Sequence, residues 1–181
     1  MSRDFPDFID PWKAADGKRQ FQGTMPLKRM GRLVPLLAAG EGVEKGVAGF
    51  SARFAHDAQG AVIIDLHVEA SLPLVCQRSL APYREQVRRE ACLAVITTLA
   101  EQDVLPANYE PVLVENGRLA LQDLVEDELL LAVPPVPREP GTLAVDRSTD
   151  GEAKPEPREE GEPTHRPFEG LAGLLKDSDG D

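Results

Sequence analysis

The sequence predicts an α+β fold in which a twisted antiparallel β-sheet, of about five to six strands, is packed by two main helices. Apolar residues recur at every second position from residue 62 onward, which is typical of a strand with one buried face. Two other segments, residues 27–39 and 121–132, carry apolar residues at helical spacing. The chain after residue 137 is acidic and rich in proline, so we expect a disordered tail there.

The longest predicted strand covers residues 62–76, with Asp65, His67, Glu69 and Ser71 on its polar face. Residues 50–54 alternate in the same way and are separated from it by the loop HDAQG, so the two segments should form a hairpin. A strand of this length is unusual, and we expect a bend or a bulge within it.

The remaining elements follow from shorter patterns. Residues 20–25 and 109–114 suit strands, and the second strand ends at the turn pair Asn116 and Gly117. Residues 83–99 fit either a helix or a returning strand, and their spacing alone favours the helix.

Two segments are predicted to be helices. In residues 27–39 the residues expected to face inward are Met30, Leu33, Val34 and Leu37. In residues 121–132 the expected core residues are Leu121, Leu124, Val125 and Leu131, and the two prolines at 134 and 135 should stop this helix.

The composition divides the chain into three parts. Residues 1–137 are long enough for a single α+β domain. Residues 138–166 are predicted to be a disordered, acidic, proline-rich linker. Residues 167–181 contain a short amphipathic segment, in which Phe168, Leu171 and Leu174 could dock on the domain or on a partner; the alternative is a frayed tail.

The charge balance limits the possible partners. The chain carries 20 Lys and Arg against 31 Asp and Glu, a net charge of -11, which opposes non-specific adhesion to nucleic acid or anionic membranes. Any RNA contact must therefore be local. Two cysteines and the lack of a long apolar stretch predict a soluble cytoplasmic protein without a membrane partner.

Four elements, in this order, resemble the signature of the YceD family, the bacterial and chloroplast proteins named for large ribosomal RNA subunit accumulation. They are CQRSLAP, NYEPVLV, LQDLVEDELLLAVPPVP and PFEGLAGLLK, and the resemblance covers roughly residues 10–137 and 167–176. It implies a role in the synthesis, processing or accumulation of 23S ribosomal RNA, with pre-ribosomal RNA or a large-subunit ribosomal protein as partner. It also implies that residues 83–96 pair as a strand, and we adopt the strand.

The CQRS element raises the possibility of a metal site. Many members of that family carry a second Cys where this chain has Ser79, and a further Cys near the linker. A structural zinc ion needs four ligands. The candidate ligands in this sequence are scattered, so we expect no metal or cofactor. These candidates are Cys76, Cys92, His56, His67 and His165. Because Cys76 continues an apolar strand face, we expect an inert buried thiol with a raised pKa, beside a structural Gln77. Cys92 is expected to point into the same core.

A basic cluster follows this element. Arg78 lies on a predicted tight turn, and Arg84, Arg88 and Arg89 follow on the next segment. On a strand Arg84 and Arg88 share a face, so with Arg78 they could present a basic strip to RNA or to another partner. The alternative is a solvated strand face whose charge is balanced by the neighbouring glutamates.

An acidic triplet, Glu126, Asp127 and Glu128, lies within the last predicted helix. Its three side chains must point in different directions, so they do not form a metal cage by themselves. We expect one of them to face inward and to pair with Arg78 or Arg84, a structural role. Two alternatives are a favourable interaction with the helix dipole and a patch that attracts a basic ribosomal protein.

Three classes of function follow. The prediction we favour is a non-enzymatic ribosome-biogenesis factor, and the second is a protein-interaction module that binds a basic ribosomal protein without touching RNA. The third, a nuclease or other hydrolase, requires convergent carboxylates or a histidine base at recognisable spacing, which the sequence lacks. We therefore expect neither enzymatic activity nor a small-molecule substrate.

Overall fold

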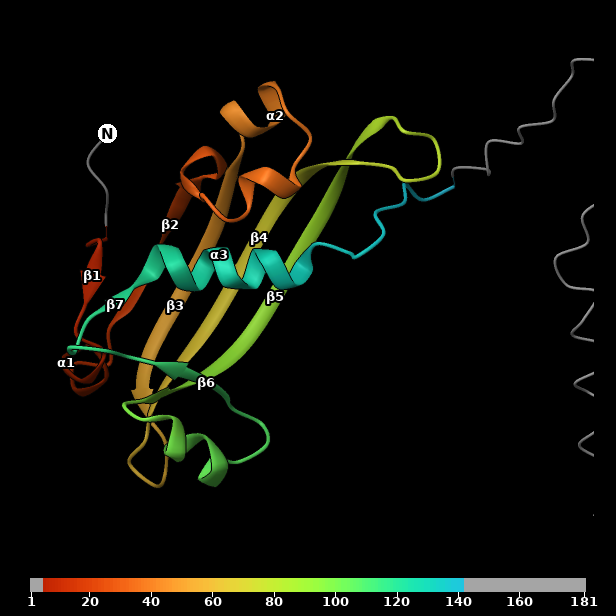
Figure 1. Cartoon of the computed structure of the whole chain (residues 1–181). Helices are drawn as coiled ribbons and strands as arrows, with labels where there is room; N and C mark the ends of the chain where they lie inside the picture. The colour runs from red at the N-terminus through yellow and green to blue at the C-terminus, as the bar shows by residue number, and fades with distance from the viewer. Residues whose placement is uncertain (1–4, 142–181) are drawn as a thin grey trace, which may run out of the picture. The chain divides into compact units, whose positions relative to one another are not determined.

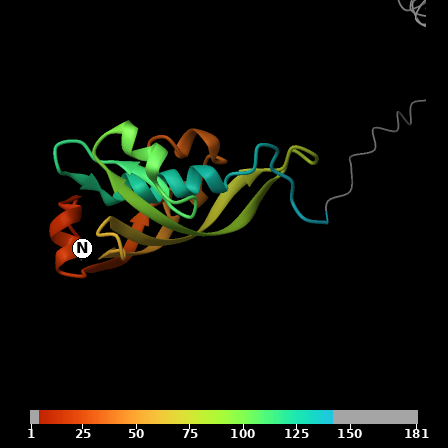
Figure 2. The ribbon, with the colours of Figure 1, turned by 90° about the horizontal axis from the view of Figure 1, so that it is seen from below.

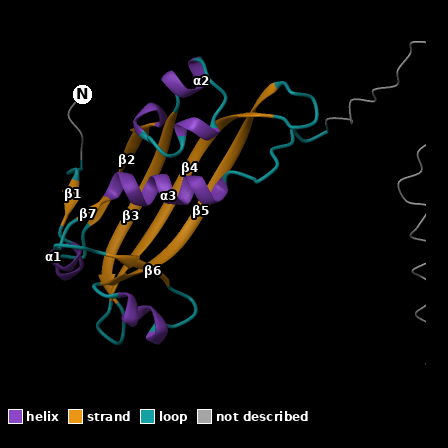
Figure 3. Cartoon of the chain, in the orientation of Figure 1, coloured by secondary structure: helices purple, strands orange, loops and turns teal. Residues whose placement is uncertain are grey.

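The computed structural model describes residues 5–141, which form an α+β fold around a five-stranded sheet (Figures 1 and 3). The strand order is β2-β3-β4-β5-β6. The strands are β2 (Gln20–Pro26), β3 (Val47–His56), β4 (Val62–Val75), β5 (Pro82–Ile96) and β6 (Glu110–Leu113). A second, two-stranded sheet pairs β1 (Phe8–Ile9) with β7 (Leu119–Ala120).

The centre of the molecule is the long antiparallel hairpin of β4 and β5. Its pairing runs from Ile63 opposite Ala94 to Val75 opposite Pro82 without a slip in register. The strand adopted for residues 83–96 is therefore confirmed, and of the bend or bulge expected in β4 the bulge is absent. The two strands instead curve gradually, and their tip projects beyond the neighbouring strands (Figure 1).

The predicted antiparallel sheet is present, but one of its four strand pairings is parallel, so the sheet is mixed. Strand β6 pairs parallel to β5, because the chain crosses back through the 3₁₀ segment η3 (Leu99–Val104) before it re-enters the sheet. A parallel neighbour requires such a crossover instead of a tight turn.

The helix predicted over residues 27–39 is wrong. The segment forms two 3₁₀ turns, η1 (Leu27–Arg29) and η2 (Val34–Leu36), because Gly31 and Pro35 both disfavour a continuous helix. Met30, Leu33 and Leu37 are buried as expected, whereas Val34 is only partly buried. Two short helices flank it in the chain, α1 (Pro11–Asp16) and α2 (Glu41–Glu44).

The helix α3 (Leu121–Ala132) is confirmed with the predicted bounds, so one main helix packs on the sheet where two were expected. It crosses one face of the sheet, and Figure 2 shows it on a single side of the strands. Leu121, Leu124 and Val125 are buried as expected. Leu131, however, is 65% exposed, and Leu129 takes its place in the core.

The two faces of the sheet therefore differ. The inner face and α3 enclose one apolar core, and the outer face carries the polar side chains of the alternating pattern. No helix among residues 5–141 is long and apolar enough to cross a membrane. The predictions for residues 142–166 and for Phe168, Leu171 and Leu174 lie outside the described residues, as does His165.

Candidate functional site

The tip of the β4–β5 hairpin is the predicted CQRS turn. The Leu80 N–H donates to the Cys76 carbonyl at 2.8 Å, and the Cys76 N–H donates to the Ala81 carbonyl at 2.9 Å. Leu80 has a positive φ of 59° and is 72% exposed. Arg78 is exposed on this turn, so its side chain is presented at the surface of the molecule.

The chain that leaves α3 is anchored on this turn. The Gln77 N–H donates to the Pro137 carbonyl at 2.8 Å, and the Glu139 N–H lies 3.4 Å from the Cys76 sulfur. Cys76 and Gln77 thus contact this segment through the sulfur atom and a backbone N–H, respectively. Residues 133–139 are tied to the hairpin tip as a result.

Cys76 is fully buried, as predicted, but the expected rise of its pKa is wrong. The Ser79 hydroxyl and backbone N–H, followed by the Glu139 N–H, donate to the sulfur and lower the pKa of Cys76 to about 6. Burial alone acts in the opposite direction, and these donors outweigh it because they stabilise the thiolate. The nearby Tyr83 hydroxyl is buried and has no hydrogen-bond partner among the described residues.

The four predicted arginines do not form one strip. Arg84 and Arg88 lie opposite Pro73 and Glu69 on the outer face of the sheet, so the prediction that they share a face is confirmed. Arg89 points to the inner face instead. Its guanidinium lies 3.1 Å from the Glu128 carboxylate, which is only 4% exposed.

The arginines that remain at the surface differ in their partners. Arg88 lies 3.8 Å from the Glu90 carboxylate, and both side chains are well exposed, so this pair contributes little. Arg84 is exposed and forms no ion pair or side-chain hydrogen bond with another residue of the described chain. Of the predicted strip, Arg84 is thus the guanidinium best placed to bind an external anion.

The acidic triplet of α3 is structural. The Glu126 carboxylate accepts the backbone N–H groups of Arg32 and Leu33 at 2.6 and 3.0 Å, and it is almost fully buried. Asp127 pairs with the Arg32 guanidinium, and Glu128 pairs with Arg89. The expectation that a carboxylate faces inward is therefore correct, but its predicted partners, Arg78 and Arg84, are wrong.

Comparison with known proteins identifies the family. The sequence profile described as "Large ribosomal RNA subunit accumulation protein YceD" matches residues 64–175. The chain belongs to the YceD family. It is 31% identical over 135 residues to the protein of that name from Haemophilus influenzae, a match that covers 73% of this chain and 74% of the relative. No solved structure matches it.

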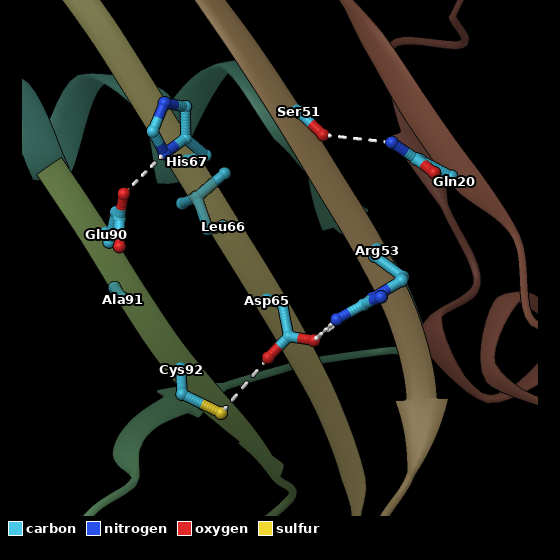
Figure 4. Close-up of a pocket in the computed structure, with 9 residues that line it drawn as sticks. All are labelled: Gln20, Ser51, Arg53, Asp65, Leu66, His67, Glu90, Ala91 and Cys92. Atoms are coloured by element: carbon cyan, nitrogen blue, oxygen red, sulfur yellow. Dashed lines mark hydrogen bonds and ion pairs between the residues drawn. The ribbon is translucent and has the colours of Figure 1, made fainter. Parts of the chain in front are cut away.

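In this YceD-family chain the outer face of the sheet also carries a shallow pocket of about 530 Å³ (Figure 4). The Arg53 guanidinium binds Asp65 at 2.7 Å, and the His67 ring lies 3.3 Å from the Glu90 carboxylate. The Cys92 thiol lies 3.5 Å from Asp65. The charged side chains of the pocket thus already pair with one another across the strands.

The position of Cys92 corrects another prediction. It lies opposite Asp65 on the outer face, whereas Cys76 is on the inner face, so the two thiols do not share a core. Burial, and then the neighbouring Asp65 carboxylate, raise the pKa of Cys92. Within residues 5–141 no three His, Cys, Asp or Glu side chains lie close enough together to hold a metal ion.

Proposed function

We propose that this YceD-family chain is a non-enzymatic factor that supports the accumulation of 23S ribosomal RNA by binding its precursor at the β4–β5 hairpin. The name of the Haemophilus influenzae relative supports a role in large ribosomal RNA subunit accumulation. The observation that carries the binding site is the exposure of Arg78, Arg84 and Arg88 along the tip and outer face of one hairpin.

The charge of the chain supports a local contact over general adhesion. A guanidinium recognises phosphate with two parallel N–H donors, so a few arginines suffice to position an RNA segment. A net charge of -11 repels nucleic acid elsewhere on the surface. Binding at this hairpin should therefore be specific in place and sensitive to salt.

The use of the buried acidic side chains supports binding without chemistry. Glu126 and Glu128 are engaged with backbone N–H groups and with Arg89, which leaves them unavailable as a general base or as metal ligands. On the outer face Cys92 has a raised pKa, so the thiol is mostly protonated at neutral pH and is a poor nucleophile.

The proposal is tested by crosslinking the tagged protein in growing cells and sequencing the attached RNA. We expect 23S precursor RNA, comigration with free large-subunit precursors and release by salt. An Arg84→Ala variant should lose most of this RNA, whereas Arg118→Ala, which changes an exposed arginine of the β6–β7 turn, should not. Wild-type protein that recovers no ribosomal RNA above background would refute RNA binding.

A second candidate is a protein-interaction module that binds a basic ribosomal protein. The acidic net charge of -11 favours this partner, because it attracts a strongly basic protein over long distances. The same crosslinking experiment separates the two candidates. Recovery of a large-subunit ribosomal protein without RNA would support the second.

A further inference from the structure

A small pocket lies beside Arg84, between the loop before α2 and the β4–β5 hairpin. Its volume is about 200 Å³, and its walls are formed mainly by Ala38, Ala39, Pro73 and Pro82. The side chains of these four residues are apolar, and Arg84 adds the positive charge at the pocket. The pocket differs in this respect from the polar depression drawn in Figure 4, where the charges are already paired.

The walls of this pocket are held rigidly. Gly42 of α2 packs so closely on β4 that a Cβ atom at this position would lie 2.9 Å from the Pro73 Cβ. The loop before α2 is also attached to β4, because the Ala38 N–H donates to the Pro73 carbonyl at 2.8 Å. Pro73 and Pro82 have fixed φ angles, so little conformational entropy remains to be lost when a ligand binds.

The Arg84 guanidinium lies at the edge of this pocket. Arg84 lies directly opposite Pro73 in the sheet, and its Nη2 atom lies 3.7 Å from the position of a Cβ atom on Gly42. Because it has no ion-pair partner among residues 5–141, the guanidinium can bind a ligand anion without breaking an existing contact.

We propose that this pocket holds one unstacked base of a single-stranded RNA segment, with an adjoining phosphate on the Arg84 guanidinium. The inference rests on the proposed function and names the form of RNA that the hairpin recognises. A base is flat and apolar on its faces, which suits the Ala and Pro side chains of the pocket, and the phosphate supplies a negative charge that pairs with the Arg84 guanidinium.

The arrangement of the neighbouring charges favours RNA over a ligand that carries a single carboxylate. Arg88 follows Arg84 on the same strand face, about 13 Å further along, and Arg78 is exposed at the tip. A nucleic-acid backbone carries a negative charge on every nucleotide and can contact several exposed cations in a row. A ligand with one carboxylate can contact only one of them.

The test measures the affinity of the full-length protein for two probes by fluorescence anisotropy. One probe is a short oligouridine, and the other is a ribose-phosphate chain of the same length without bases. Wild-type protein should bind the oligouridine roughly fivefold more tightly, the effect expected when about 40 Å² of apolar base surface is removed from water. Ala39→Leu, which fills the mouth of the pocket at an exposed position, should abolish this preference. Ala100→Leu is the matched control at an exposed position of η3 and should keep it.

A second variant tests the phosphate contact. Arg84→Ala should weaken the binding of both probes roughly tenfold at low salt and lower the slope of log affinity against log salt by about one. If Ala39→Leu keeps the wild-type preference for bases, the pocket is not the base site, although the hairpin still binds RNA. If wild-type protein binds neither probe but binds a basic ribosomal protein, the proposed RNA contact itself is wrong.

Discussion

The contact that most clearly stabilises the fold is the Glu126 carboxylate, and the change Glu126→Ala tests it. This carboxylate accepts the N–H of Leu33, a fully buried residue, at 3.0 Å. Loss of the acceptor leaves that N–H without a partner, at a cost of about 1–3 kcal/mol. The Arg32 N–H and guanidinium are more exposed, so water replaces their contacts with Glu126. Loss of these contacts should therefore cost only about 1 kcal/mol more.

We therefore expect the free energy of unfolding of Glu126→Ala to fall by about 2–4 kcal/mol, a large part of the ~5–15 kcal/mol typical of a domain. The assay is urea denaturation followed by circular dichroism, with an unchanged dependence on urea concentration. Glu126→Gln should lie between the wild type and Glu126→Ala, because its carboxamide keeps one acceptor oxygen.

The neighbouring Asp127 provides the control. Its side chain is 52% exposed and pairs with the exposed Arg32 guanidinium, so Asp127→Ala should cost no more than about 1 kcal/mol. If Glu126→Ala destabilises the protein no more than Asp127→Ala, the contacts of Glu126 with the backbone N–H groups do not stabilise the fold.

Three further predictions follow from the other contacts. Arg89→Ala should lower the free energy of unfolding by about 2–3 kcal/mol in urea denaturation, because it leaves the buried Glu128 carboxylate without its partner. RNA binding should stay intact, and its loss in a folded variant would contradict a purely structural role of Arg89. The pKa of Cys76 is lowered to about 6, so its thiolate stabilises the fold fully above the unfolded pKa, and this contribution is lost as the pH falls through about 6. In urea denaturation the difference in free energy of unfolding between the wild type and Cys76→Ala should grow from pH ~6 to ~8.5, and a constant difference would refute the shift. The pKa of His56 is raised, first by its hydrogen bond to Asp16, so its charge stabilises the fold below pH ~6.5 and this contribution is lost as the pH rises through the folded pKa; Asp16→Asn should lower the His56 midpoint in an NMR titration, and an unchanged midpoint would contradict the contact.

Much of the sheet is predictable because an alternating pattern determines the face of each residue once its pairing is known. The register of β4 and β5 places Arg84 and Arg88 on one face, as that pattern required. The two 3₁₀ turns were missed because the spacing of Met30, Leu33 and Leu37 fits a helix. Gly31 and Pro35, which interrupt that helix, were the available signal.

The contacts within the site were harder to predict, because they join residues far apart in the chain. Glu126 meets backbone groups 93 and 94 positions away, and Glu128 meets a side chain 39 positions away. Periodicity contains no information about such pairs. The pKa of Cys76 was mispredicted because an alternating pattern does not show which donors reach the sulfur; these are first the hydroxyl and N–H of Ser79 and then the N–H of Glu139.

The two buried carboxylates of α3 also determine which changes in length the protein tolerates. An inserted residue between Glu126 and Glu128 would turn one carboxylate by about 100° relative to the other. Only one of them could then keep its partner, either the backbone of residues 32 and 33 or Arg89 on β5. Insertions and deletions should therefore be excluded from this turn of the helix in functional variants, even where its individual residues can be exchanged.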